Sequence, residues 1–178
     1  MTDLAGFFDT RLGVDTIAVR LLVATVLGGL LGFEREYRAR PAGMRTHILV
    51  ALAAATFAVV TLELMLQADT QGITGTDPIR VIEAVTAGVA FLAAGTIIFS
   101  RGEVHGLTTG ASLWLSGAIG VACGTGYYFI ALLATGLAFF VLTVLRWVEK
   151  LMPQTEPPPA VRDVKDGGRQ AKDGGGDQ

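Results

Sequence analysis

Five apolar runs of similar length dominate this chain and constrain its fold more than any other feature. They cover residues 17–33, 47–66, 81–99, 107–123 and 127–145. Each run approaches the about 17 to 25 helical residues that cross a hydrocarbon core of roughly 30 Å. Lipid offers no partners to backbone polar groups, so a spanning segment satisfies them internally as a helix. We therefore expect an all-α, polytopic membrane protein, a five-transmembrane-helix bundle.

The distribution of positive charge predicts the orientation of these helices, because cytoplasmic loops carry an excess of Lys and Arg. Four arginines follow the first run: Arg35, Arg38, Arg40 and Arg45. The segments on the other side hold only Arg11 and Arg80. The fourth run is short and rich in glycine and hydroxyls, so it is either a span or a re-entrant, broken helix. Arg146 and Lys150 reach the cytoplasm only if it crosses, and we expect five spans, N-out and C-in.

The two ends of the chain differ in composition from its apolar centre. Residues 1–16 carry three aspartates, an acidic flank unlike that of a cleaved signal peptide, so we expect a periplasmic segment and a retained first span. Residues 148–178 hold a proline triplet and a glycine triplet among many charges. Such a composition buries too little apolar surface to fold. We expect a disordered cytoplasmic tail there and a transmembrane domain at 17–147.

Three ionisable residues lie within the predicted spans: Arg20, Glu63 and Glu83. A charged group at membrane depth is costly, by at least about 2.5–3.5 kcal/mol at a helix centre, and is often functional. With alternating helix directions and a rise of about 1.5 Å per residue, all three lie within roughly 5 Å of the outer boundary. Two interpretations remain open. Either they form one ion-responsive charged layer that holds a cation or moves a proton, or each side chain reaches the interface separately.

A polar stripe follows the fourth run. Its members are Thr109, Ser112, Ser116, Gly120 and Cys123, whose helical spacing puts them on one face. Hydroxyls on such a face either join neighbouring helices, at about 0.6 kcal/mol per contact, or line a translocation path, and we favour the first. Cys123 is the only thiol, and is either a packed small residue, which we favour, or an outward-facing group that cross-links two subunits.

Small residues at helical spacing predict where the helices touch. The candidates are Gly28, Gly32, Gly88, Gly95 and Gly120. Glycine lets helix backbones approach closely in lipid. We favour this packing role over the alternative, a pore lined by glycines.

Polar residues also gather at the predicted cytoplasmic face: Glu34, Arg35, Arg45, Thr46 and His47. An ion pair between Glu34 and Arg45 would fix the loop between the first two helices. Together with Glu103 and His105 these residues also suggest a metal site, but the spacing matches no tight ligand motif. We favour anchoring of the arginines at the membrane interface.

Two motifs resemble the signatures of the MgtC/SapB family of bacterial inner-membrane proteins. The first is GFERE at 32–36, followed by AGMRTH at 42–47. The second is GVAFLAAG at 88–95, followed by GLTTGASLW at 106–114 and AIGVACG at 118–124. The resemblance covers about residues 17–145, with both motifs in the family's order and spacing.

The resemblance implies a five-helix domain in the bacterial inner membrane that serves adaptation to low magnesium and, in some pathogens, survival in macrophages and restraint of the ATP synthase. Family members are usually regarded as regulators. This sequence departs from the family at Ala90 and Ala93, where glycines are usual, and at Ala84, where a glutamine is common. The larger members carry an ACT-like domain where this chain has its polar tail, so we expect the shorter, SapB-like branch.

Two functional classes follow. The first is a regulator in magnesium limitation and ion homeostasis, acting through a membrane-protein partner such as the ATP synthase or a Mg²⁺ transporter. The second is a small Mg²⁺ or H⁺ transporter that uses Glu63, Glu83 and the polar stripe. The chain shows no evident repeat and no mid-depth carboxylate, which transport would favour, so we expect the regulator.

Other classes and partners are constrained by composition and motifs. No nucleophile–base pair or phosphate loop indicates an enzyme, and a net charge of −2 gives no footprint for nucleic acid. We expect no cofactor, with Mg²⁺ as the ion to be sensed or transported. The expected partners are the lipid bilayer, another membrane protein and a second copy of the chain.

Overall fold

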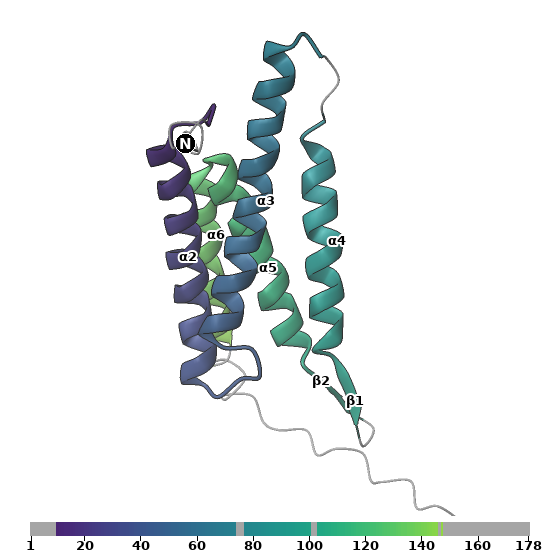
Figure 1. The fold of residues 1–178 in the computed structure, drawn as a ribbon. Helices are drawn as coiled ribbons and strands as arrows, with labels where there is room; N and C mark the ends of the chain where they lie inside the picture. The colour runs from purple at the N-terminus through teal and green to yellow at the C-terminus, as the bar shows by residue number, and fades with distance from the viewer. Residues whose placement is uncertain (1–9, 74–76, 101–102, 146, 148–178) are drawn as a thin grey trace, which may run out of the picture.

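The computed structural model describes residues 10–73, 77–100, 103–145 and 147. Within these ranges the chain folds into antiparallel α-helices joined by turns and one small hairpin (Figure 1). The predicted all-α helical bundle is confirmed. Residues 148–178, where we expect a disordered tail, lie outside the described part of the chain, as do residues 1–9.

Each of the five apolar runs contains a helix. The elements are α2 (Val14–Tyr37), α3 (Met44–Thr70), α4 (Ile79–Gly95), α5 (Leu107–Thr125) and α6 (Tyr128–Phe140), which continues as a π-helical turn η1 (Val141–Leu145). The helices α2 and α3 extend past their apolar runs at both ends. Their ends carry charged and polar residues, so hydropathy alone underestimates their length.

The third predicted span, 81–99, is wrong at its end. The helix α4 stops at Gly95, and β1 (Ile98–Ser100) pairs antiparallel with β2 (Glu103–His105), Phe99 lying opposite Val104. Apolar runs of this kind fit a strand as well as a helix, and β-branched residues favour the strand. Gly106 then leads into α5 with φ +89°, and an added Cβ would lie 1.9 Å from the Thr96 carbonyl oxygen, so this turn requires glycine.

The fourth run forms the central helix of the bundle. The helix α5 is continuous over 19 residues, so the re-entrant or broken alternative is wrong. It packs against α2, α3, α4 and α6. Over its most apolar window 56% of its residues are buried, against 28% for α2 and 33% for α3, because its small residues let four neighbours approach.

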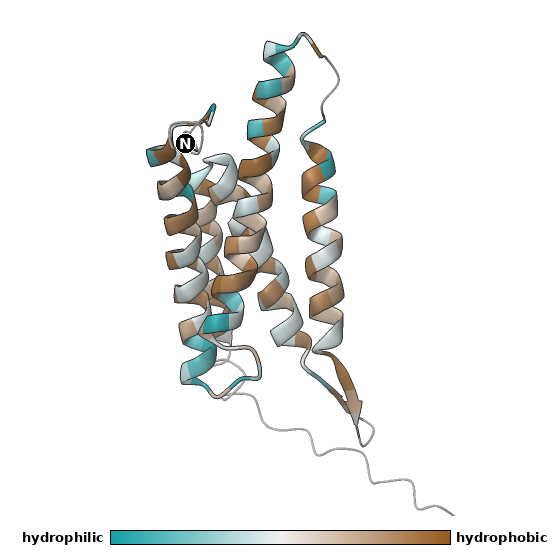
Figure 2. Ribbon diagram, in the orientation of Figure 1, coloured by the Kyte–Doolittle hydropathy of each residue, from teal (hydrophilic) through white to brown (hydrophobic). Residues whose placement is uncertain are grey.

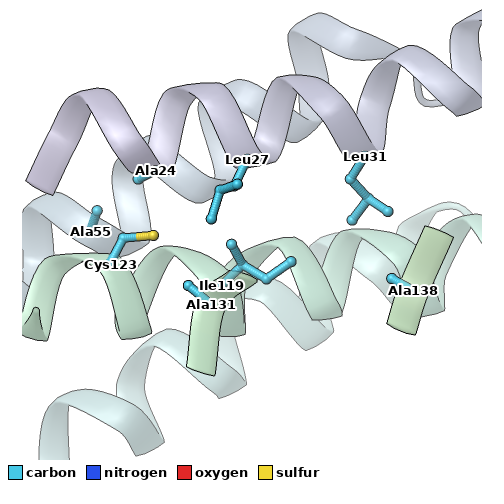
Figure 3. Packing of buried hydrophobic residues seen from close by; sticks show 8 residues of the cluster. All are labelled: Ala24, Leu27, Leu31, Ala55, Ile119, Cys123, Ala131 and Ala138. Carbon is cyan, nitrogen blue, oxygen red and sulfur yellow. The ribbon is translucent and has the colours of Figure 1, made fainter. Parts of the chain in front are cut away.

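The core lies between α2, α3, α5 and α6, and half of its buried members are alanines. Its buried members are Ala24, Leu27, Leu31, Ala55, Ile119, Cys123, Ala131 and Ala138. Figure 3 shows Leu27 of α2 and Ile119 of α5 pointing toward each other across this interface. Such small side chains mean that the helix backbones themselves come close together.

Glycines provide the closest approaches. A Cβ added to Gly28 would lie 2.8 Å from the Ala51 Cβ, one at Gly32 would lie 2.5 Å from the Met44 Cα, and one at Gly120 would lie 2.2 Å from the Ala51 carbonyl oxygen. Gly88 and Gly95 differ from our prediction, because an added Cβ at either meets no atom within 4 Å. These two glycines therefore do not hold helices together within this chain.

The outside of the bundle is apolar. Large hydrophobic side chains such as Leu22, Phe57, Phe91 and Phe129 are more than half exposed, and Figure 2 shows hydrophobic residues along the helices with hydrophilic ones toward their ends. By length and composition α2, α3 and α5 can each cross a membrane, whereas α4 has 17 residues and α6 is shorter. The protein is therefore a helical membrane protein.

A buried polar junction as candidate functional site

Polar side chains meet inside the bundle at the end that carries the hairpin, where α2 ends and where α3 and α5 begin. We call this cluster the polar junction, and its members are Arg35, His47, Thr109, Ser112 and Ser116. Each is at most 5% exposed. Buried polar groups are costly unless they are hydrogen-bonded, so the partners of these side chains decide what the cluster does.

Arg35 joins α2 to α5. Its Nη2 donates to the Thr109 hydroxyl oxygen over 2.7 Å. Arg35 lies in the last turn of α2, and Thr109 lies in the first turn of α5. A hydrogen bond from a charged donor is stronger than a neutral one, and this one connects residues 74 positions apart.

His47 joins α3 to α5 at two levels. Its Nδ1 lies 2.9 Å from the Gly43 carbonyl oxygen, which can only accept, so Nδ1 carries a proton. Its Nε2 lies 3.1 Å from the Ser112 hydroxyl oxygen. The Ser116 hydroxyl, one turn further along α5, donates to the His47 carbonyl oxygen over 3.1 Å. The first turn of α3 is therefore bound to α5 through side chain and backbone.

Ser112 has one hydroxyl proton and two nearby acceptors. Its oxygen lies 2.9 Å from the Thr109 carbonyl oxygen as well as 3.1 Å from Nε2 of His47. When the imidazole is neutral, Nε2 accepts and the hydroxyl must choose between these partners. The single proton of this hydroxyl can therefore serve a bond within α5 or a bond to α3, but not both at once.

Close helix packing brings the side chains of the polar junction within hydrogen-bond distance of one another. The stripe residues Thr109, Ser112 and Ser116 follow one another at intervals of three and four, so they share the face of α5 that meets α2 and α3. On α2, Gly28 admits the backbone of α3, because an added Cβ would lie 2.9 Å from the His47 carbonyl oxygen. Larger residues there would push His47 away from the hydroxyls.

The predicted ion pair between Glu34 and Arg45 is wrong. Glu34 is 5% exposed and pairs with Arg38, four residues along the same helix, because this spacing brings side chains together on one face. Arg45 and Thr46 are exposed. The loop is instead fixed by Glu36, whose Oε2 accepts the backbone N–H of Met44 over 2.8 Å.

The predicted charged layer does not form an ion-pair cluster among the described residues, and Arg20 and Glu63 have separate partners. Arg20 donates to the Gly124 carbonyl oxygen over 2.8 Å. The Glu63 carboxylate accepts the backbone N–H groups of Arg11 and Leu12 over 2.8 and 2.6 Å. Glu83 is exposed on α4, and within the described ranges no ion pair joins it to the other two. These contacts agree with the interpretation in which each residue is satisfied separately.

The remaining stripe residues lie in the core. Gly120 packs against α3, and Cys123 is fully buried beside Ala24 and Ala55. A buried thiol cannot face outward to cross-link two subunits, so that alternative is wrong. No group of three His, Cys, Asp or Glu side chains close enough to hold a metal ion occurs in the described ranges. His47 lies in the polar junction and His105 is exposed on β2.

Sequence reasoning identified all five members of the polar junction but missed several bonds of polar residues outside it. Arg38 and Glu36 lie inside or beside the GFERE motif, and their local bonds follow from helix spacing. Gly124 closes the AIGVACG motif, but its carbonyl as a partner of Arg20 has no signal in the sequence. Such a bond depends on the packing of α2 against α5.

An apolar exterior around a hydrogen-bonded interior defines an all-α membrane bundle. The chain belongs to the MgtC family, whose sequence profile matches residues 21–151. It is 45% identical to Protein MgtC of Brucella abortus over 130 residues, which is 72% of this chain and 51% of that protein. It is also 34% identical to YhiD of Escherichia coli K12 over 126 residues, which is 71% of this chain and 59% of YhiD.

The chain thus spans only about half the length of its Brucella relative. No solved structure shows a significant match. The matched region contains most of the bundle and the whole polar junction, so these features lie in the part that the chain shares with its relatives.

Proposed function

We propose that this protein acts in the bacterial inner membrane as a regulator in magnesium limitation. It binds another membrane protein and thereby influences ion balance. Two relatives support the link to magnesium. The Brucella relative carries the family's name, MgtC, and YhiD is named as a candidate magnesium transporter. Both align with most of the bundle described above, and each is longer than this chain.

The observation that carries the choice of regulator over transporter is the mutual satisfaction of the polar groups. Thr109, Ser112 and Ser116 bond to α2, to α3 or to their own helix. None of the three lines either of the two large cavities, of about 610 and 530 Å³, which are walled mainly by apolar side chains. Hydroxyls with these partners hold helices together, which supports a structural role for the stripe over an ion path.

The alternative is a small Mg²⁺ or H⁺ transporter, which the name of YhiD favours. In that case Glu63 would have to release two backbone donors before it could bind an ion. Mg²⁺ gives up its water reluctantly and usually meets one or two carboxylates. The bonds of Glu63 therefore support the regulator, and a flux measurement separates the two functions.

We further propose five spans, N-out and C-in. Arg38, Arg40 and Arg45 lie at the hairpin end of the bundle, in or beside the turn from α2 to α3, and positive charge marks the cytoplasmic side. The 17 residues of α4 span about 26 Å, which is close to the thickness of the hydrocarbon core. Arg80 lies at the opposite end, in the first turn of α4.

Growth at limiting Mg²⁺ tests the proposed function. The full chain is expressed in a bacterium that lacks its own MgtC-family protein, and we expect it to restore growth at limiting but not at replete Mg²⁺. Thr109→Val removes one hydrogen-bond partner of Arg35 and should reduce the rescue, whereas the control Thr108→Val changes an exposed neighbour. A chain that reaches the membrane fraction without restoring growth, or that helps equally at both concentrations, contradicts the proposal.

A further inference from the structure

The helix α4 lies at the edge of the bundle. It packs mainly against α5 and touches α3 much less (Figure 1). A groove of about 530 Å³ separates α3 from α4. We call it the α3–α4 groove, and its walls include Ala54 and Phe57 from α3, and Ala84, Gly88 and Leu92 from α4.

The groove opens toward the membrane. Phe57 is 61% exposed and Leu92 is 54% exposed. An added Cβ at Gly88 would meet no atom within 4 Å. Small residues on α4 therefore leave a hollow on the surface that faces lipid, and an apolar occupant would fill it at no cost in desolvation of polar groups.

One charged residue lines this groove. Arg80 lies in the first turn of α4 and is exposed. Within the described part of the chain no ion pair involves its guanidinium. A guanidinium binds phosphate oxygens through two parallel N–H donors. The groove thus combines an apolar channel with a phosphate-binding group at one end.

The length of the groove matches one leaflet of a bilayer. From Arg80 to Leu92 the helix rises by about 18 Å, slightly more than half of a hydrocarbon core of roughly 30 Å. A lipid whose phosphate rests on Arg80 would extend its chain along Ala84 and Gly88 to Leu92.

We propose that the α3–α4 groove binds one phospholipid, with its phosphate on Arg80 and one acyl chain along Gly88. A transmembrane helix of a second copy fits less well. An apolar helix would leave the guanidinium of Arg80 at the end of the groove without an anionic partner, whereas a phospholipid supplies a phosphate. A single acyl chain is narrow enough to enter.

Native mass spectrometry tests the proposal. The full chain is purified in mild detergent and titrated with palmitoyl-oleoyl phosphatidylglycerol, and bound lipid is counted for each variant. Gly88→Leu fills the groove without a clash, and its control, Gly136→Leu, places the same side chain at an equally open site on α6. Arg80→Gln removes the phosphate-binding group, and its control is Arg45→Gln, an exposed arginine at the other end.

We expect one tightly held phospholipid in the wild type and in both controls. Arg80→Gln should weaken its binding by about tenfold, as expected for the loss of charge-assisted hydrogen bonds, and Gly88→Leu should abolish it. If the variants lose no more bound phospholipid than their controls do, the proposal is overturned, because the lipid would then be bound unspecifically. A dimer that Gly88→Leu disrupts also overturns it, since a second copy would be the occupant. Circular dichroism checks that each variant is folded. If Gly88→Leu does not fold, the lipid binding of Arg80→Gln decides the test.

Discussion

Replacing Gly120 by alanine puts one methyl group where the backbones of α3 and α5 meet. The added Cβ would lie 2.2 Å from the Ala51 carbonyl oxygen and 2.8 Å from the Ala54 Cβ. Ordinary contacts between such atoms lie at about 3.5 Å, so the helices must separate by roughly 1 Å. No side-chain rotation relieves this clash, because the nearest atom belongs to the backbone of α3.

The separation has a cost that can be worked out from the contacts. Overpacking of a close interface costs about 1–3 kcal/mol. The bond from Ser116 to the His47 carbonyl lies one turn away and would lengthen, which removes about 0.6 kcal/mol more. Alanine is a better helix former than glycine by about 1 kcal/mol, which offsets part of this cost. We therefore expect Gly120→Ala to lower the free energy of unfolding by about 1–3 kcal/mol.

Gly136→Ala is the matched control. It makes the same chemical change in α6, where an added Cβ meets no atom within 4 Å. Alanine is a better helix former than glycine by about 1 kcal/mol, so this variant should be as stable as the wild type or slightly more so. Unfolding in mixed micelles with increasing sodium dodecyl sulfate, followed by circular dichroism, measures both changes. Equal stabilities of the two variants would refute the close approach of α3 and α5.

Three further predictions address the polar interior and the orientation. Ser116→Ala should lower stability by about 0.6 kcal/mol, because its hydroxyl bridges two helices, whereas Thr56→Ala should not, because its hydroxyl bonds within α3; identical unfolding curves would argue against the bridge. Cys123 should resist membrane-permeant thiol reagents until the protein unfolds, since it is fully buried; rapid labelling of the folded protein would contradict its position. Cysteines introduced at Thr46 and Gln71 lie at opposite ends of α3, so an impermeant reagent added outside intact cells should label only position 71; the reverse pattern would invert the proposed topology.

The apolar runs predicted the helices well because length and hydropathy are properties of a single segment. The prediction failed at residues 96–99, where an apolar, β-branched sequence is compatible with either helix or strand, and pairing with β2 decides. The prediction also made α2 and α3 too short at both ends. Their last turns carry polar residues, which are stabilised by contacts that no hydropathy window sees.

The candidate site was predictable only in part, because it also depends on contacts between different segments of the chain. Helical spacing put Thr109, Ser112 and Ser116 on one face, but their partners Arg35 and His47 come from other helices. Such pairings depend on how α2 and α3 dock on α5, which one sequence does not specify.

The charged layer shows the limit most clearly. The helix lengths predicted an equal depth in the membrane for the three residues, but depth does not fix direction around a helix axis. Glu63 bonds to the backbone that precedes α2, and Arg20 bonds to the end of α5. Each side chain therefore bonds to nearby backbone groups, and no ion pair forms between Arg20 and Glu63.

The flux of Mg²⁺ into liposomes that contain the purified chain tests the proposed role most directly. A fluorescent Mg²⁺ indicator inside the vesicles reports entry, and an added ionophore shows that the vesicles respond. Since the hydroxyls of α5 and the carboxylate of Glu63 are already hydrogen-bonded, we predict no entry above that in empty liposomes. Robust Mg²⁺ entry that Glu63→Gln abolishes would contradict the regulator and establish transport.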